Sequence, residues 1–436
     1  MHQNYFLNRI TSCRTCASLV IALLDFDSTY IICIEIFEEG LPIFFTLYGM
    51  AINRLLIAMF IAPRIHQFHN SITVSEVIGK FYGHYGYITS SVVTTFFSLI
   101  GISIQIFAFE HLINFFFDIP LWWAIIFTFF LSIYTTFGGI KLVSYLENFH
   151  FLFIICAMIT YVLVVLLNIN LVTLEYLIEK TTQSINIDGN QFIRYLSLWI
   201  IYIIAPLDPT SIHRLLASFN SKQAVSASIH ASYIAFFYVT SIGFISLSIR
   251  YFVLGKESDI TLVESINNFI PSILKIIIIC LFIAAIIASA AADLSIIGIS
   301  LTKDITMRYL KINWKNKTQI LCYRITIIIV ALISFGISNN FDKIERFSIL
   351  LMNFWVSSIL ITFIFILYGK IYSIKVFLTG IIGSIIITLL WNIVLLDITQ
   401  LPGVLIGSTF HISFLTFSKS TYQMQETVIG IDRKKY

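Results

Sequence analysis

Long apolar stretches alternate with short polar connections along almost the whole chain. About twelve of these stretches are mostly apolar over roughly 20 residues, which is the length that an α-helix needs to cross the hydrocarbon core of a bilayer. Their approximate bounds are 16–37, 42–62, 88–116, 120–139, 149–168, 193–208, 229–249, 271–299, 319–338, 347–367, 374–395 and 400–417. The pattern predicts an all-α integral membrane protein with about twelve transmembrane helices.

Composition supports this prediction and excludes a water-soluble globular protein. Hydrophobic residues make up 58% of the 436 residues and charged residues only 11%. The expected organisation is a short cytoplasmic N-terminus over 1–15, a transmembrane domain over 16–418 and a cytoplasmic C-terminal tail over 419–436. No soluble catalytic or signalling domain is expected.

The distribution of Lys and Arg predicts the orientation of the helices. With the N-terminus inside, most of the 27 Lys and Arg residues fall in inner loops, where the positive-inside rule places them. We therefore expect both termini to be cytoplasmic, with the protein in the inner (cytoplasmic) membrane of a cell. The basic run over 303–317 is explained by inside retention and anionic lipid, so the lipid bilayer is an expected partner and nucleic acid is not.

Two apolar stretches carry features that are unusual in lipid. The sixth is interrupted by Pro206 and Pro209, and discontinuous helices expose backbone groups that transporters use to bind ions and solutes. The eighth collects small residues with one hydroxyl and one carboxylate, Ser289 and Asp293. Polar and ionisable residues in a span indicate a functional site by default. An ordinary proline kink and close helix packing are the alternatives.

Four separated stretches together resemble the sodium/solute symporter family, which includes bacterial proline and pantothenate carriers and the sodium/glucose transporters. They are APRI with ITVSEVIGKFYG at 62–65 and 72–83, IYTTFGGIKLV at 133–143, DPTSIHRLLA at 208–217 and the small-residue segment over 284–304. The first looks like a loop after the second core helix, and the third like the signature that closes a broken sixth helix. The resemblance implies two inverted five-helix repeats, with solute and ion held at mid-membrane between broken helices 1 and 6.

The resemblance also implies ion-coupling positions. Family members hold sodium with backbone carbonyls of core helix 1 and two adjacent hydroxyls of core helix 8, and the corresponding residues here are Ile21, Leu24, Ala285, Ala288 and Ser289. The alanine at 288 removes one hydroxyl oxygen, which leaves sodium and proton coupling as alternatives. Asp293 lies one helical turn from Ser289 and could carry a proton. Glu147 occupies the place of a family aspartate near the inner sodium exit.

The remaining candidates concern the solute and the gates. For solute binding we select two mid-span carboxylates with a neighbouring hydroxyl, one glutamine and the break in the sixth helix: Asp25, Asp27, Ser28, Gln105, Asp208 and Pro209. For gating or structural roles we select Gly138, Gly139 and Arg214. No catalytic residue and no cofactor are expected, apart from a transported sodium ion.

These residues predict a secondary active transporter that couples sodium or protons to the uptake of a small organic solute, such as proline or another amino acid. One alternative is a degenerate, non-transporting family member that acts as a sensor, because the first 39 residues contain no glycine and Ala288 lacks a hydroxyl. The other is a membrane-embedded transferase. It would need His, Asp or Glu side chains that converge at one interface, whereas the nine histidines are scattered.

Overall fold

A computed structural model gives the structure of the chain. It describes residues 12–21, 32, 35–36, 39–68, 71–117, 123, 125–136, 147, 151–152, 155–156, 158–160, 162–163, 188–252, 272–310, 312, 315–339, 353–399, 401–420 and 422–423. All structural statements below concern these residues.

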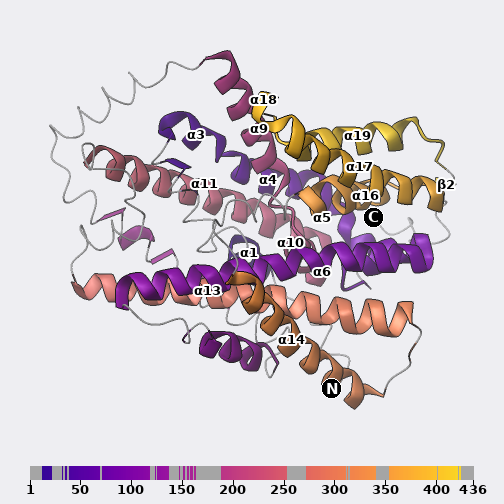
Figure 1. Cartoon of the computed structure of the whole chain (residues 1–436), viewed down its shortest axis with the longest axis horizontal. Helices are drawn as coiled ribbons and strands as arrows, with labels where there is room; N and C mark the ends of the chain where they lie inside the picture. The colour runs from indigo at the N-terminus through magenta and orange to yellow at the C-terminus, as the bar shows by residue number, and fades with distance from the viewer. Residues whose placement is uncertain are drawn as a thin grey trace.

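The described part is built of helices and one two-stranded sheet (Figure 1). In chain order the elements are α1 (Ser12–Ile21), α3 (Leu41–Thr46), α4 (Gly49–Leu56), η2 (Ile57–Ile61), α5 (Ala62–Ile65), η3 (His66–Phe68), α6 (Val74–Phe117), α9 (Gly189–Ile204), α10 (Pro209–Ala217), α11 (Ser221–Phe252), α13 (Ser272–Ile299), η4 (Ser300–Tyr309), α14 (Asn316–Ser338), η5 (Trp355–Leu360), α16 (Ile361–Leu367), β1 (Lys370–Ile371), α17 (Ile374–Val394), α18 (Leu396–Thr399), α19 (Gly403–Phe417) and β2 (Tyr422–Gln423). Three of these elements, η2, η4 and η5, are π-helical. Strands β1 and β2 pair antiparallel.

The predicted all-α membrane fold is confirmed. Within the described ranges, 7 helical segments are long and apolar enough to cross a bilayer: Leu41–Phe68, Val74–Asn114, Gly189–Ala217, Ser221–Phe244, Phe282–Met307, Lys317–Ser338 and Ile374–Val394. Shorter apolar helices cover Ile125–Thr136, Trp355–Leu367 and Gly403–Phe417. Each overlaps an expected stretch, whereas the expected spans 16–37 and 149–168 lie largely outside the described residues.

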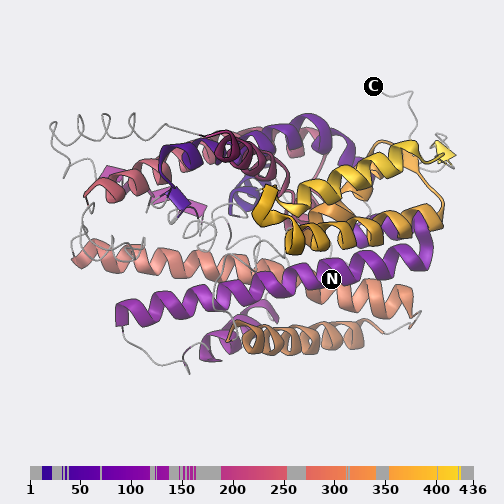
Figure 2. The ribbon, with the colours of Figure 1, turned by 45° about the horizontal axis from the view of Figure 1, so that its top comes forward.

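The helices pack in three groups (Figure 2). In the first, α4 and α11 pack against each other, α1 packs on α11, and α9 packs on α4. In the second, α6 runs along α13, η4 and α14. In the third, α17 and α19 pack together and against η5. Helix α10 contacts the first and the second group, so it lies at the boundary between them.

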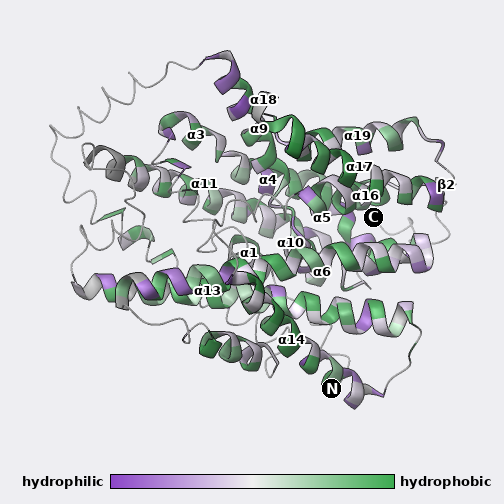
Figure 3. Ribbon diagram, viewed as in Figure 1, coloured by the Kyte–Doolittle hydropathy of each residue, from purple (hydrophilic) through white to green (hydrophobic). Residues whose placement is uncertain are grey.

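Hydrophobic residues dominate most of the described helices (Figure 3). Large side chains such as Phe45, Ile133 and Phe236 are more than half exposed, which suits contact with lipid tails. Hydrophilic residues gather toward helix ends, as at the start of α9. The apolar exterior agrees with a multi-pass membrane protein.

Helix α6 begins earlier than the sequence pattern suggested. The stretch 72–83, which resembles a family loop, is helical from Val74 onward. Its first turn is fixed by side chains, because the Thr73 hydroxyl accepts from the Glu76 amide at 3.0 Å and the Glu76 carboxylate accepts from the Ile72 amide at 2.8 Å. The helix kinks at Gly83, whose φ of 57° is accessible to glycine.

Helices α4 and α9 approach each other closely at Gly49. A Cβ atom at this position would lie 2.7 Å from the Trp199 carbonyl oxygen and 2.9 Å from Cβ of Tyr202. Both distances are too short for a side chain to fit. Glycine therefore allows the backbones of α4 and α9 to touch.

Candidate transport site

The predicted break in the sixth span lies between α9 and α10. Three carbonyls around it accept hydrogen bonds from side chains of other helices. The Asn53 amide donates to the Ile203 oxygen at 2.6 Å. The guanidinium of Arg54 donates to the Pro206 carbonyl at 3.1 Å, and the indole of Trp355 donates to the Leu207 carbonyl at 2.9 Å. Elements α4 and η5 thus satisfy the backbone groups that the break releases.

Arg54 is a site residue that the sequence pattern did not single out. It is 0% exposed, and its Nη1 donates to the Ser211 hydroxyl at 3.2 Å as well as to the Pro206 carbonyl. A buried arginine in a membrane span is a functional signal in its own right. This signal was present in the sequence, because Arg54 lies within the apolar stretch 42–62.

Two of the predicted solute residues start helix α10. Asp208 is its N-cap and accepts from the Ser211 amide at 2.5 Å, and Pro209 is its first residue. An aspartate cap followed by proline is a favourable helix start. These contacts account for the break, and a solute contact of either residue remains a prediction.

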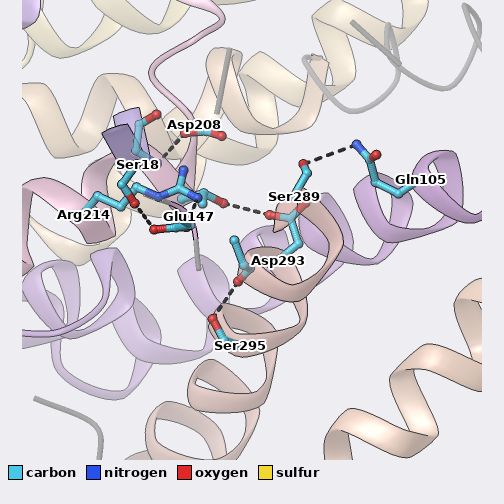
Figure 4. Close-up of polar contacts among 11 residues, drawn as sticks. Ser18, Gln105, Glu147, Asp208, Arg214, Ser289, Asp293 and Ser295 are labelled. Carbon is cyan, nitrogen blue, oxygen red and sulfur yellow. Dashed lines mark hydrogen bonds and ion pairs between the residues drawn. The ribbon is translucent and has the colours of Figure 1, made fainter. Parts of the chain in front are cut away.

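The broken helix contacts the small-residue helix through one short hydrogen bond (Figure 4). The hydroxyl of Thr210, in the first turn of α10, donates to Oδ1 of Asp293 on α13 at 2.7 Å. Asp293 is partly exposed, whereas the residues on either side of it, from 288 to 292 and from 294 to 300, are buried. Asp293 is therefore a partly exposed residue within a buried run of α13, at the point where α13 meets α10.

One turn earlier on α13, Ser289 is joined to α6. The side-chain amide of Gln105 donates to the Ser289 hydroxyl at 3.3 Å, and both residues are nearly fully buried. Ala285 and Ala288 lie on the same helix and are each 2% exposed. Two predicted residues, one assigned to the solute and one to the ion, are thus direct neighbours.

A buried ion pair lies farther along α10. Arg214 contacts Glu147 at 2.7 Å, with side chains that are 5% and 4% exposed. The second carboxylate oxygen of Glu147 accepts from the Ser18 hydroxyl of α1. The cluster of Ser18, Glu147 and Arg214 ties α1 and α10 to the segment that contains residue 147 (Figure 4).

The other predicted residues cannot be placed in this site. Leu24, Asp25, Asp27, Ser28, Gly138 and Gly139 lie outside the described residues. Ile21 is the last residue of α1, and only its backbone is described.

Comparison with known proteins identifies the family. A family model described as the sodium:solute symporter family matches residues 27–388. The chain belongs to the sodium:solute symporter family. This membership confirms the resemblance seen in the four sequence stretches. No curated protein is similar enough in sequence to count as a relative.

Solved structures agree with the family assignment at the level of the fold. A Na⁺-coupled sialic acid symporter in a substrate-bound outward-open state is similar with a TM-score of 0.82 and 15% identity, over 97% of this chain and 93% of the symporter. The nucleobase-cation-symport-1 family transporter Mhp1, closed with bromovinylhydantoin bound, is similar with a TM-score of 0.59 and 13% identity, over 94% of this chain and 93% of Mhp1. A manganese transporter from Eremococcus coleocola is similar with a TM-score of 0.53 and 14% identity, over 93% of this chain and 92% of the manganese transporter. The fold is thus shared with cation-linked transporters, as the predicted inverted-repeat architecture requires.

Proposed function

We propose that this protein is a secondary active transporter that carries a small organic solute together with a cation by alternating access. The observation on which the proposal mainly rests is the Thr210–Asp293 hydrogen bond, which joins the broken helix to the small-residue helix beside a partly exposed carboxylate. Broken helices at mid-membrane are the usual place for solute and ion in such transporters. Family membership favours this function over the membrane-embedded transferase.

The proposed coupling ion is sodium or a proton, and different residues support each. Ser289 retains one of the two hydroxyls expected for sodium, and the Ala285 carbonyl belongs to the same helix. Asp293 supplies a carboxylate oxygen one turn away, which suits either a hard cation or a proton. The name of the family favours sodium.

The proposed solute is proline or another amino acid, and the resemblance to proline carriers motivates it. The scaffold alone does not select among solutes, because a few pocket side chains decide specificity. Gln105, adjacent to Ser289, is the described residue that we expect to influence the choice of solute.

The proposed orientation places the protein in the inner membrane with both termini in the cytoplasm. The excess of Lys and Arg in the predicted inner loops supports it. Proteolysis of a C-terminal epitope in intact cells and in inside-out vesicles checks this orientation, since only the vesicles should lose the epitope.

The test of function is uptake of proline, and of a panel of other amino acids, sugars and carboxylates, into proteoliposomes under separate sodium and proton gradients. Ser289→Ala and Asp293→Asn are compared with the parent. Ser295→Ala is the matched control, because Ser295 is buried on the same helix but donates to the Ala292 carbonyl at 2.7 Å. We expect this control to transport like the parent.

Each result has a definite meaning. Sodium-driven uptake that is lost in Ser289→Ala identifies sodium as the coupling ion. Proton-driven uptake that is lost in Asp293→Asn identifies the proton. A parent protein that binds a solute but accumulates none under either gradient contradicts transport and supports the non-transporting sensor.

A further inference from the structure

Several buried hydroxyls of α6 have no hydrogen-bond partner among the described residues. Ser91, Thr94 and Ser98 are 0%, 3% and 0% exposed, and their oxygens bond to no group in the described part of the chain. By contrast, Ser90 and Ser103 of the same helix donate to the carbonyls four residues earlier. A buried hydroxyl in a membrane helix ordinarily satisfies itself in this way. Ser91, Thr94 and Ser98 therefore call for a polar environment beside the helix.

Helical spacing places these hydroxyls on the face of α6 that carries Gln105. Successive intervals of 3, 4 and 7 residues separate Ser91, Thr94, Ser98 and Gln105. This spacing keeps all four side chains on one side of the helix. Gln105 contacts Ser289, so this side is directed at α13. Helix α6 packs along α13 and then η4, and both views show the helices side by side (Figures 1 and 2).

The facing helix has a matching series of polar residues. Ser289, Asp293, Ser300 and Asp304 follow one another at intervals of 4, 7 and 4 residues. Ser300 is 0% exposed, and its hydroxyl likewise has no partner among the described residues. Asp304, also 0% exposed, accepts from the Thr73 hydroxyl at 2.7 Å, just before α6 begins. We call these two facing series the polar seam.

Cross-helix hydrogen bonds close the polar seam at both ends, at Gln105–Ser289 and at Thr73–Asp304. The 15 residues between Ser289 and Asp304 correspond to a rise of about 22 Å, which is most of the thickness of a bilayer core. The second half of α13 continues as the π-helix η4 from Ser300 onward. π-Helical turns are frequent at functional sites.

We propose that the polar seam is a hydrated route by which the coupling cation moves between Ser289–Asp293 and the membrane face at Thr73–Asp304. The proposal rests on the proposed function and adds to it the path of the ion. A small cation requires oxygen partners at each step, and the seam provides hydroxyls along its length with a carboxylate toward each end. The positive-inside rule makes the Asp304 end cytoplasmic, because Lys80 and Lys303 lie there, so the route releases the cation to the cytoplasm.

Cysteine accessibility tests the route without requiring transport. Single cysteines at Thr94, Ser98 and Ser300 are introduced after the six native cysteines are replaced by serine. The control positions are Ser90 and Ser103, which are on the same helix but satisfied by its backbone. The probe is a small cationic methanethiosulfonate reagent, applied to inside-out vesicles.

We expect the seam cysteines to react about tenfold faster than the control cysteines, because thiol modification follows water access. Seam cysteines that react no faster than those at positions 90 and 103 would overturn the route. At the serine positions the substitution exchanges one oxygen for sulfur, and at Thr94 it also removes a methyl group. Size-exclusion chromatography of each variant in detergent verifies that it is folded.

A second experiment links the seam to coupling. In the double variant Ser98→Ala/Ser300→Ala, we expect solute affinity to be unchanged and gradient-driven uptake to fall about tenfold, which corresponds to about 1.4 kcal/mol. Unchanged uptake would overturn the route. The two proposals fail in different ways: reactive seam cysteines without any uptake contradict only transport, and coupled uptake with unreactive seam cysteines contradicts only the route.

Discussion

Two sets of polar contacts hold the boundary of α10, and they differ in charge and burial. The Ser18–Glu147–Arg214 cluster pairs a full positive and a full negative charge, with both side chains almost completely buried. The Thr210–Asp293 contact has one carboxylate and one hydroxyl, and its carboxylate is partly exposed. The same helix is therefore held at one end by an ion pair and at the other by a bond that water or a cation could replace.

These differences in charge and burial suit the two contacts to different roles. Separating a buried ion pair leaves two charges without compensation in a medium of low polarity, so such a pair favours one conformation strongly. A hydroxyl bound to an accessible carboxylate can be exchanged at low cost. We interpret the Ser18–Glu147–Arg214 cluster as the contact that holds α1 and α10 together, and the Thr210–Asp293 contact as the one that responds to the ion.

The largest expected effect is on the ion pair. Arg214→Leu leaves the buried Glu147 carboxylate without its cation, and we expect a loss of about 3–5 kcal/mol in the free energy of unfolding. Arg194→Leu is the control, because its partner is Glu39 but its side chain is 43% exposed, and the expected cost there is at most about 1 kcal/mol. Thermal unfolding in detergent micelles measures both. Equal losses in the two variants would remove the distinction between the cluster and a surface pair.

A smaller effect is expected at the helix break. Trp355→Phe removes the donor to the Leu207 carbonyl, and an unpaired buried carbonyl costs about 1–3 kcal/mol. Trp391→Phe is the matched control, since Trp391 donates to the Leu401 carbonyl at 3.0 Å, away from the break. We expect only Trp355→Phe to reduce solute uptake. Reduced uptake in both variants would mean that the effect is one of general stability.

The Thr210–Asp293 contact is measured by a double-mutant cycle. Thr210→Val and Asp293→Ala, alone and together, are expected to show a coupling energy of about 1 kcal/mol, as is common for hydrogen bonds between membrane helices. Chemical unfolding in micelles gives the four stabilities. The coupling should shrink when sodium or protons are added at saturating concentration, if Asp293 binds the ion. A coupling of several kcal/mol, insensitive to either ion, would make this contact resemble the ion pair instead.

The smallest effect on stability is expected for Gln105→Ala, at about 0.6 kcal/mol. Its long bond of 3.3 Å to Ser289 contributes little to folding, so the change should be visible mainly in function. We expect a higher ion concentration at half-maximal uptake with a maximal rate close to that of the parent. An unaltered ion dependence would separate Gln105 from the ion site.

Much of the fold follows from the sequence because hydrophobic length is a strong signal in membrane proteins. The described spans fall where apolar stretches predicted them, and the break at Pro206 and Pro209 is visible in the chain. Ser289, Asp293, Glu147 and Arg214 could also be selected, because hydroxyls and charges are conspicuous in apolar segments. The roles of these four residues remain predictions.

The environment of the break could not be predicted in the same way. Asn53 and Trp355 donate to backbone carbonyls. Because every residue has a backbone carbonyl, the sequence of the acceptor segment does not indicate which carbonyl is bonded. The start of α6 was missed because a capping pair, Thr73 with Glu76, resembles the polar residues of a loop. Pairings such as Thr210–Asp293, across 83 positions of the chain, require the three-dimensional arrangement.

The contact at Gly49 has a kinematic consequence. Helix α4 contacts the backbone of α9 there, and about one turn further along, the adjacent residues Asn53 and Arg54 donate to the Ile203 and Pro206 carbonyls. These attachments oppose sliding or rotation of α9 against α4. Helices α4 and α9 and the break are therefore expected to move as one rigid unit, without a hinge at the break. Any movement of this unit must be accommodated at the contact between α10 and α13.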